Sequence, residues 1–263
     1  MASGTKWAAL LGILKALGSA AVAFSGGVDS TLLLAAAKEA LGDRCVAYTV
    51  RSPFFPAREA EEAAALCQRL GVEQVALTVD TLALPGVAEN PPERCYLCKR
   101  AVLGAILDSA ARRGIAHVVE GSNVDDRGDY RPGARAVREL GVRSPLLEAG
   151  LTKAEIRKLS KKLRLPTAAK PAMACLASRV PTGETLTPET LRRVEAAEEY
   201  LHGLGLTQVR VRVHGDVARI EALPGEFRRL RRHAAEADGK LKALGFRYVA
   251  LDLGGYKMGN MNG

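Results

Sequence analysis

The sequence predicts an α/β fold in which a parallel, doubly wound sheet is followed by a second, smaller α+β domain. Three observations support this class. From Ala20 onward, short apolar runs alternate with helical stretches through the first 165 residues. The apolar periodicity stops over residues 166–186, and strands with period-two alternation appear within residues 187–263. Alternating strands and helices predict a parallel sheet covered by helices.

The first domain, residues 1–165, opens with a βαβαβ pattern and continues with further helices around one short strand. Its last expected helix begins with a capping-box pair, Thr152 and Glu155. The expected elements, in order, are strand Ala20 to Phe24, helix from about Thr31, strand Cys45 to Val50, helix from about Ala57, strand Gln74 to Val79, helix Tyr96 to Arg113, strand His117 to Glu120 and helix Thr152 to Leu163.

Prolines and a glycine punctuate residues 166–186, which therefore cannot form a long helix and are expected to connect the two domains at the active site. Residues 187–263 form the small domain. Its expected elements are helix Pro188 to Leu204, strands Gln208 to Val213 and Val217 to Ala222, a charged helix near Glu226 to Leu244, and strand Arg247 to Leu253.

Composition narrows the function classes. The apolar runs are far shorter than the roughly 20 residues of a membrane span, and the N-terminus has no export-signal pattern, so we expect a cytoplasmic protein. Five cysteines are too few and too unevenly spaced for a disulfide framework. The net charge of +9 is spread along the chain and only 5% of residues are aromatic, so nucleic-acid binding is not expected.

A glycine-rich loop, Ser25 to Ser30, lies between the first strand and the first helix. Gly26 and Gly27 let the backbone approach a ligand closely, while helix-start N–H groups and the Ser25 and Ser30 hydroxyls can surround phosphate oxygens. Asp29 can hold Mg²⁺. The loop lacks the lysine of a Walker A motif, which favours cleavage between the α and β phosphates. The alternative is an ordinary tight turn.

Three cysteines stand apart from the core pattern. Cys95 and Cys98 begin a helix one turn apart, and Cys175 lies in the connecting segment. Three thiols suit a [4Fe-4S] cluster, a zinc site completed by another ligand, or a redox pair with a catalytic thiol. Cys45 and Cys67 occupy apolar element faces, where core packing is expected.

In the small domain, the alternation of Val209 to His214 places Arg210 and Arg212 on one strand face, where two guanidiniums can grip a phosphate. A solvated strand face is the alternative. Glu221, on the neighbouring strand, can pair with these arginines or bind a cation.

Together these motifs resemble the LarE family of PP-loop ATP pyrophosphatases, which share a HUP-like fold and insert sulfur into a pyridinium mononucleotide during synthesis of the nickel-pincer cofactor of lactate racemase. The resemblance covers nearly the whole chain. It rests on SGGVDS at Ser25, CYLCK at Cys95, EGSNVDD at Glu120, YRPG at Tyr130, SPL at Ser144, KPAMACLASR at Lys170, VRVRVHG at Val209 and the terminal GGYKMGNMN.

The resemblance implies adenylylation of pyridinium-3,5-dicarboxylate mononucleotide by ATP, then sulfur attack that gives a thiocarboxylate and AMP. Asp29 and Asp125 would assist Mg²⁺ and pyrophosphate. The further residues implied at the ATP site are Lys99, Gly121 and Asn123; those at the substrate are Ser178, Arg179, Arg210 and Arg212; and carboxylates implied near a metal-sensitive site are Glu199 and Glu221.

Some family members use the cysteine that matches Cys175 as a sacrificial donor, and others carry a [4Fe-4S] cluster on three cysteines. Because Cys95, Cys98 and Cys175 are all present, we expect the cluster type, fed by a sulfide or persulfide donor, in a homo-oligomer such as a hexamer. Ala172 and Thr182 depart from the family pattern, in which a serine and a tyrosine are expected. The rival hypotheses are a PP-loop tRNA thiolase and a zinc-stabilised scaffold.

Overall fold

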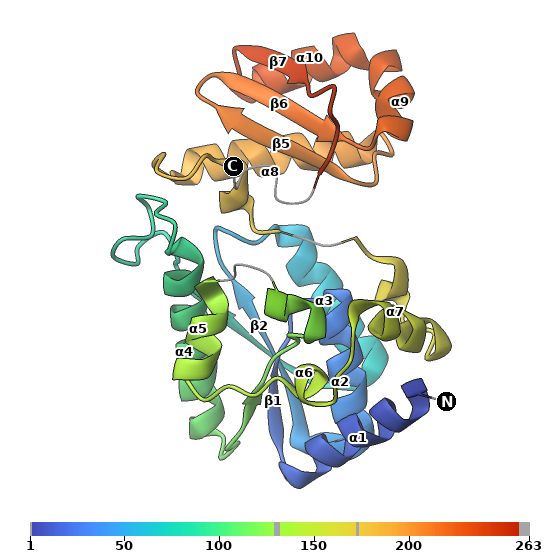
Figure 1. Ribbon diagram of the computed structural model, residues 1–263. Coiled ribbons are helices and arrows are strands. Elements are labelled where there is room, and N and C mark those ends of the chain that lie inside the picture. Colours follow the sequence, from blue (N-terminus) through green and yellow to red (C-terminus); the bar gives the residue numbers. More distant parts are fainter. Residues whose placement is uncertain (1, 129–131, 172–173, 258–263) are drawn as a thin grey trace. The chain divides into compact units, whose positions relative to one another are not determined.

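The structure is a computed structural model that describes residues 2–128, 132–171 and 174–257 (Figure 1). The chain divides into two compact units. The first comprises Met1–Thr81 and Glu93–Met173, and the second comprises Leu82–Pro92 and Ala174–Gly263. None of the helices within the described ranges is long and apolar enough to cross a membrane.

The first unit contains a parallel four-stranded sheet with the order β3-β2-β1-β4. Its strands are β1 (Ala20–Ala23), β2 (Cys45–Arg51), β3 (Glu73–Thr78) and β4 (Val118–Val119). The strand order reverses between β1 and β4, and ligands of doubly wound sheets bind outside the carboxyl ends of the strands at such a switch point. The predicted parallel sheet is therefore confirmed, and its topology marks where a site should lie.

Helices cover both faces of this sheet (Figure 1). They are α1 (Ala2–Ala16), α2 (Val28–Leu41), α3 (Ala57–Leu70), α4 (Arg94–Arg112), α5 (Pro132–Glu139), α6 (Pro145–Glu148) and α7 (Lys153–Lys162). Ala20 and Val22 of β1 pack into one core cluster with α1, α2, α3 and α7, whereas Ala21 packs into a second cluster with α4 and α5. The period-two alternation of a strand thus produces the two buried faces.

Two boundaries of the first unit differ from the sequence prediction. Helix α2 begins at Val28, three residues before the expected start at Thr31, so the glycine loop leads directly into it. No element was expected before Ala20, yet α1 occupies that stretch and buries Leu10 and Leu14 completely. The Thr152–Glu155 capping box is confirmed at the start of α7.

The second unit combines helix α8 (Pro188–Gly203) with a three-stranded sheet of order β5-β6-β7. Strand β5 (Val209–His214) is antiparallel to β6 (Val217–Ala222), and β6 is parallel to β7 (Tyr248–Leu251). The single charged helix expected near Glu226 to Leu244 is wrong. The chain forms α9 (Phe227–Arg232) and α10 (Ala234–Ala243), because His233 leaves helical geometry with φ −107°.

Residues 82–92 belong to the second unit although they lie between β3 and α4 in the sequence. Asn90, in the left-handed region with φ 55°, accepts a hydrogen bond from the Gly183 amide at 2.8 Å and donates one to the Pro181 carbonyl at 2.7 Å. Among its described residues, 166–171 and 174–186, the connecting segment contains two short 3-10 turns, at Pro166–Ala169 and Leu176–Arg179, and no longer helix. The domain boundaries given above, 1–165, 166–186 and 187–263, stay a prediction.

Candidate active site

The glycine loop follows β1 at the switch point of the sheet. Gly26 lies in the left-handed region with φ 71°, and Gly27 is the N-cap residue of α2. None of the described side chains caps the first turn of α2. Its N–H groups therefore remain available at the positive end of the helix, where a phosphate is stabilised.

Hydroxyl groups form hydrogen bonds within the loop. The Oγ atoms of Ser25 and Ser30 lie 3.1 Å apart, and the Thr31 hydroxyl donates to the Gly27 carbonyl at 2.8 Å. Ser30 and Thr31 are buried, whereas Ser25 is exposed. Thr31 thus fixes the loop conformation, and Ser25 and Ser30 present a linked pair of hydroxyls beside the free helix end.

The turn after β4 packs closely against this loop. A Cβ atom at Gly121 would lie 3.1 Å from the Ser30 amide nitrogen, closer than ordinary contacts allow. Only glycine fits this approach without displacing the backbone. The approach brings Asn123 to the loop, where its amide donates to Asp29 Oδ1 at 3.3 Å. Sequence-predicted residues of two separate motifs therefore meet here.

Asp29 and Asp125 are linked through one residue that the sequence analysis missed. The Lys153 ammonium group forms an ion pair with Asp29, and the Lys153 amide donates to Asp125 Oδ2 at 2.7 Å. The Asn123 Oδ1 atom accepts from the Asp125 amide at 3.0 Å. The only signal for Lys153 in the sequence is its place at the first helical position after the Thr152 cap.

Lys99 projects from α4 toward the end of β4. Its ammonium group lies 3.0 Å from Glu120, a buried carboxylate that also accepts from the Ser144 hydroxyl at 2.6 Å and the Ser122 amide at 3.0 Å. Burial alone would raise the pKa of Glu120, but Lys99 and the two hydrogen-bond donors outweigh it and lower that pKa below the ordinary value. Glu120 is therefore ionised and holds Lys99 in place.

A second missed lysine, Lys170, supports the loop from the side of α3. Its ammonium group contacts Glu59 at 2.7 Å, Glu62 at 2.8 Å and the Gly26 carbonyl at 3.2 Å, and its side chain is only 13% exposed. Burial raises the pKa of Glu62, yet Lys170 and Arg58 lower it further than burial raises it. The connecting segment is thereby attached to the phosphate loop.

The cysteines fall into two groups. Cys45 and Cys67 are buried in the core, where burial raises their thiol pKa values to about 12 and about 11, so the predicted packing role is confirmed. Cys95 on α4 is exposed, and Cys98 is half-buried.

Cys175, a half-buried free thiol, belongs to the second unit, so the three candidate ligands are divided between the units. Within either unit, the described residues include no group of three His, Cys, Asp or Glu side chains placed to hold a metal ion.

The arginine strand of the second unit is buried on both faces. Arg210 and Arg212 are 2% and 6% exposed, which excludes a solvated strand face. Arg212 pairs with Glu221 at 2.9 Å, and Arg219 approaches the same carboxylate at 3.1 Å. Arg210 stacks over Tyr256 at 5.3 Å. Burial and the nearby Arg179 lower the pKa of Arg210, which nevertheless stays a cation at neutral pH.

Glu199 and Thr182 are exposed, and Ala172 lies outside the described residues. Ser178 and Arg179 form the 3-10 turn that follows Cys175. Arg179 is completely buried against Glu198 of α8, with a separation of 2.8 Å. Glu198 was not predicted to take part in the site, because its pattern in the sequence is that of an ordinary helix carboxylate.

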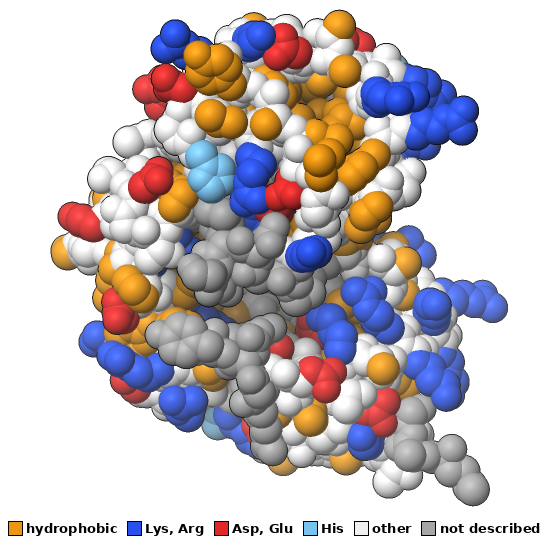
Figure 2. Space-filling model, turned by 45° about the horizontal axis from the view of Figure 1, so that its top comes forward, with side chains coloured by type: hydrophobic (Ala, Val, Ile, Leu, Met, Phe, Trp, Pro, Cys, Tyr) orange, Lys and Arg blue, Asp and Glu red, His pale blue; other side chains and the backbone are white. Residues whose placement is uncertain are grey.

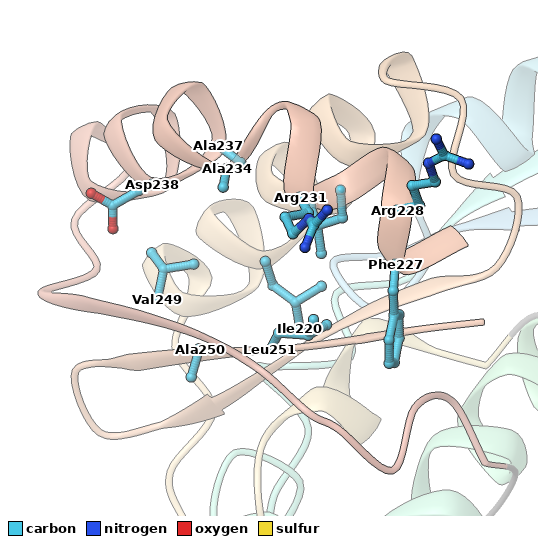
Figure 3. Close-up of a pocket in the computed structure, with 11 residues that line it drawn as sticks. Ile220, Phe227, Arg228, Arg231, Ala234, Ala237, Asp238, Val249, Ala250 and Leu251 are labelled. Atoms are coloured by element: carbon cyan, nitrogen blue, oxygen red, sulfur yellow. The ribbon is translucent and has the colours of Figure 1, made fainter. Parts of the chain in front are cut away.

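A cavity of about 610 Å³ opens between α9, α10 and the sheet of the second unit (Figure 3). Phe227, Ile220 and Leu251 line it with apolar surface, and its charged lining residues are Arg228, Arg231 and Asp238. No sequence-predicted site residue lines this cavity. On the face shown in Figure 2, Lys and Arg side chains lie in several separate groups among acidic and apolar ones.

These features define the class of protein. A parallel sheet with a glycine loop at its switch point, lysines around that loop and no Walker A lysine is the arrangement of a PP-loop ATP pyrophosphatase. Residues 19–88 match the family model described as queuosine biosynthesis protein QueC. The chain is also 33% identical over 163 residues to a glutamine-hydrolysing GMP synthase of Aeropyrum pernix, covering 56% of this chain and 31% of that protein.

Two full-length similarities are more specific. The chain is 40% identical to the pyridinium-3,5-bisthiocarboxylic acid mononucleotide synthase of Lactiplantibacillus plantarum, over 98% of this chain and 94% of that protein. It is 42% identical to an uncharacterized protein of Synechocystis, over 94% and 92% of the two chains. The chain belongs to the LarE family and is an ATP-dependent, sulfur-transferring enzyme.

Proposed function

We propose that this enzyme adenylylates the carboxylate of pyridinium-3,5-dicarboxylate mononucleotide with ATP and converts it to a thiocarboxylate, releasing pyrophosphate and AMP. The product would serve synthesis of the nickel-pincer nucleotide cofactor of lactate racemase. The observation that carries the proposal is the 40% identity, over 98% of the chain, to a synthase named for the corresponding bisthiocarboxylate.

The first half-reaction is assigned to the first unit. A substrate carboxylate oxygen attacks the α-phosphorus of ATP, and the bond to the bridging oxygen on the β side breaks, so pyrophosphate leaves with the bonding electrons. The uncapped N–H groups of α2 and the hydroxyls of Ser25 and Ser30 would hold the departing pyrophosphate. Lys99 and Lys153 would stabilise its developing charge.

Asp29 and Asp125 suit Mg²⁺, because both carboxylates share a cluster with the amide of Asn123 beside the loop. When bound, the ion would neutralise phosphate charge. Gly26 and Gly27 let the loop backbone approach a phosphate chain, and Gly121 lets the turn after β4 pack against the start of α2. Asp29, which pairs with Lys153 in this structure, would then be a ligand of the ion.

The second half-reaction needs a sulfur donor. Cys95, Cys98 and Cys175 are incompletely buried and form no disulfide, and three thiolates are a donor set that fits a [4Fe-4S] cluster with one open iron. When bound, that cluster would carry the sulfide to be transferred, supplied by free sulfide or by a persulfide together with a two-electron reductant such as a thiol pair. The variant hypothesis makes Cys175 itself the donor.

The second unit is assigned to substrate recognition. Arg210 and Arg212 are proposed as ligands of the substrate phosphate, with Ser178 nearby. Glu199 and Glu221 stay predicted as carboxylates near a metal-sensitive site, although Glu221 is paired with two arginines. Residues 187–263 are proposed to form this domain and to assemble a homo-oligomer such as a hexamer, with residues 166–186 as the connecting active-site segment.

Anaerobic incubation with ATP, Mg²⁺ and the dicarboxylate mononucleotide tests the proposal. We expect AMP, pyrophosphate and thiocarboxylate in equal amounts. AMP release that depends on tRNA, with thiolated tRNA as the product, would instead establish the rival function.

Iron and sulfide analysis with the visible spectrum of the reconstituted protein tests the cluster. An iron-free active enzyme whose Cys175 becomes lighter by about 34 Da would establish the sacrificial-cysteine variant.

A further inference from the structure

The backbone of Cys175 is held by an unusual number of donors. Its carbonyl accepts from the Ser178 amide at 3.0 Å, from the Ser178 hydroxyl at 2.8 Å and from Arg179 Nη1 at 3.0 Å. The same Arg179 nitrogen donates to the Ala174 carbonyl at 2.7 Å. The residue that carries the sulfur is thus fixed on both sides of its Cα atom by one turn and one guanidinium group.

The remaining donors of Arg179 bind a buried carboxylate. Nε and Nη2 each donate to one oxygen of Glu198 at 2.8 Å, which is a bidentate pair, and the side chain of Arg179 is 0% exposed. A guanidinium whose three nitrogens all donate to protein atoms has little capacity left for a substrate. Arg212 is engaged in a similar way, with Nε and Nη2 on Glu221 and Nη1 on the Ser178 carbonyl. Arg179 differs in that its Nη1 atom donates to the carbonyls of Ala174 and Cys175.

Glu198 also contacts the arginine strand. Its Oε1 atom accepts from the Val211 amide at 2.9 Å, and Val211 stands between Arg210 and Arg212 in β5. A second connection runs from Arg212 Nη1 to the Ser178 carbonyl at 2.9 Å. One buried carboxylate therefore joins the Cys175 turn to the strand that carries both arginines.

A buried ion pair contributes little to stability over an apolar pair of the same volume, because desolvation of both charges offsets their attraction. The contribution of this pair is better explained by geometry. A transferred group must reach the substrate within a fraction of an ångström of the productive position, and rigid, hydrogen-bonded supports provide such accuracy.

We propose that Glu198 and Arg179 form a positioning unit that sets the distance between Cys175 and the phosphate-binding face of Arg210 and Arg212. Arg179 is then a positioning residue and not a substrate ligand. The inference rests on the proposed function, in which the substrate phosphate is held at one end of this distance and sulfur is delivered at the other. The positioning unit would match the distance between Cys175 and the two arginines to the length of a mononucleotide.

The test uses the full-length double variant Arg179→Met/Glu198→Leu, which removes both charges together and so leaves no unpaired buried ion. Arg193→Met is the matched control, since Arg193 also belongs to the second unit but stacks on Phe246 at 4.2 Å and has no contact with the Cys175 turn. Circular dichroism and thermal unfolding establish that both variants fold.

For the double variant we expect thiocarboxylate formed per AMP to fall by roughly ten- to hundred-fold, because misplaced sulfur lets water consume the adenylate. The dissociation constant of the dicarboxylate mononucleotide should rise by less than about ten-fold, since Arg210 and Arg212 remain. Arg193→Met should keep the one-to-one ratio.

An unchanged ratio in the double variant would overturn the inference. So would a roughly hundred-fold rise in the dissociation constant of the dicarboxylate mononucleotide, whatever the ratio, because it would make Arg179 a ligand. If the wild-type protein forms no thiocarboxylate, the proposed function fails. Amide hydrogen exchange then tests the positioning role by itself. Exchange over residues 174–180 should be about ten-fold faster in the double variant, and equal exchange would refute the positioning role.

Discussion

The two units differ in the cations that pair with their buried or half-buried carboxylates. In the first unit, Lys99, Lys153 and Lys170 surround the phosphate loop, each paired with a carboxylate. In the second unit, buried arginines meet glutamates with forked geometry, as Arg179 meets Glu198. The ammonium group of lysine is a compact charge on a flexible chain and can change partners. The planar guanidinium group of arginine instead fixes the orientation of the carboxylate that it binds. The difference suggests that the first unit stabilises charge that appears and leaves, and the second holds position.

The largest expected effect comes from a lysine of the first unit. Lys153→Met should reduce AMP formation by about 10²–10³-fold, because the α2 end would lose a cation that meets the departing pyrophosphate. Lys158→Met, at an exposed position on the same helix, is the control and should change the rate little. A loss of less than about three-fold in Lys153→Met would mean that Lys153 only pairs with Asp29.

Lys170→Met should chiefly lower stability. It leaves Glu59 and Glu62 without their shared cation and frees the Gly26 carbonyl, at a cost of about 1–3 kcal/mol in the free energy of unfolding. Unfolding by urea measures this loss in the free energy of unfolding. The control Arg58→Met removes an exposed i,i+4 partner of the same Glu62 and should cost about 0.5 kcal/mol. Equal losses would show that the contact of Lys170 with the loop adds nothing.

The pH dependence of Lys99→Met tests the ionisation of Glu120. The pKa of Glu120 in the folded protein is below its ordinary value of 4.5, so the stabilisation from this pair is complete above that value and is lost as pH falls through the lowered pKa. The variant should be about 1 kcal/mol less stable near neutral pH. This difference should vanish in acid. A difference that grows as pH falls would contradict the assignment.

The smallest expected effect is a difference in alkylation between the accessible and the buried thiols. In the folded, cluster-free protein, iodoacetamide should alkylate Cys95, Cys98 and Cys175, because these thiols are accessible. Cys45 and Cys67 should remain unmodified, since burial raises their pKa values to about 12 and about 11 and excludes the reagent. Mass spectrometry before and after denaturation gives the number of alkylated cysteines. Rapid labelling of Cys45 would refute its core position.

The parts of the fold with a periodic pattern were predictable. Strand β1, with the glycine loop and helix after it, shows both the alternation and the turn chemistry that define a switch-point site. Helix α1 was missed because it is apolar around much of its circumference and has no cap signal. The break at His233 was missed because charged residues continue through it, and a backbone dihedral leaves no mark in such a run.

The glycine loop and the aspartates that the structure brings beside it stand out in the sequence, whereas the roles assigned to Cys95, Cys98 and Cys175 stay predictions. Lys153, Lys170 and Glu198 do not stand out, since single charged residues on helices or loops look like solvated surface. Their roles depend on contacts with residues distant in the sequence, such as Lys170 with Gly26. Arg210 and Arg212 were placed on one strand face, but the burial of that face came from packing.

The central claim is that the substrate carboxylate becomes an acyl adenylate. The most direct test uses dicarboxylate mononucleotide labelled with oxygen-18 in its carboxylates, incubated with ATP and Mg²⁺ under anaerobic conditions. The attacking carboxylate oxygen stays on the phosphorus when sulfur displaces AMP, so the released AMP should contain one labelled oxygen. Unlabelled AMP, formed together with thiocarboxylate, would contradict the account.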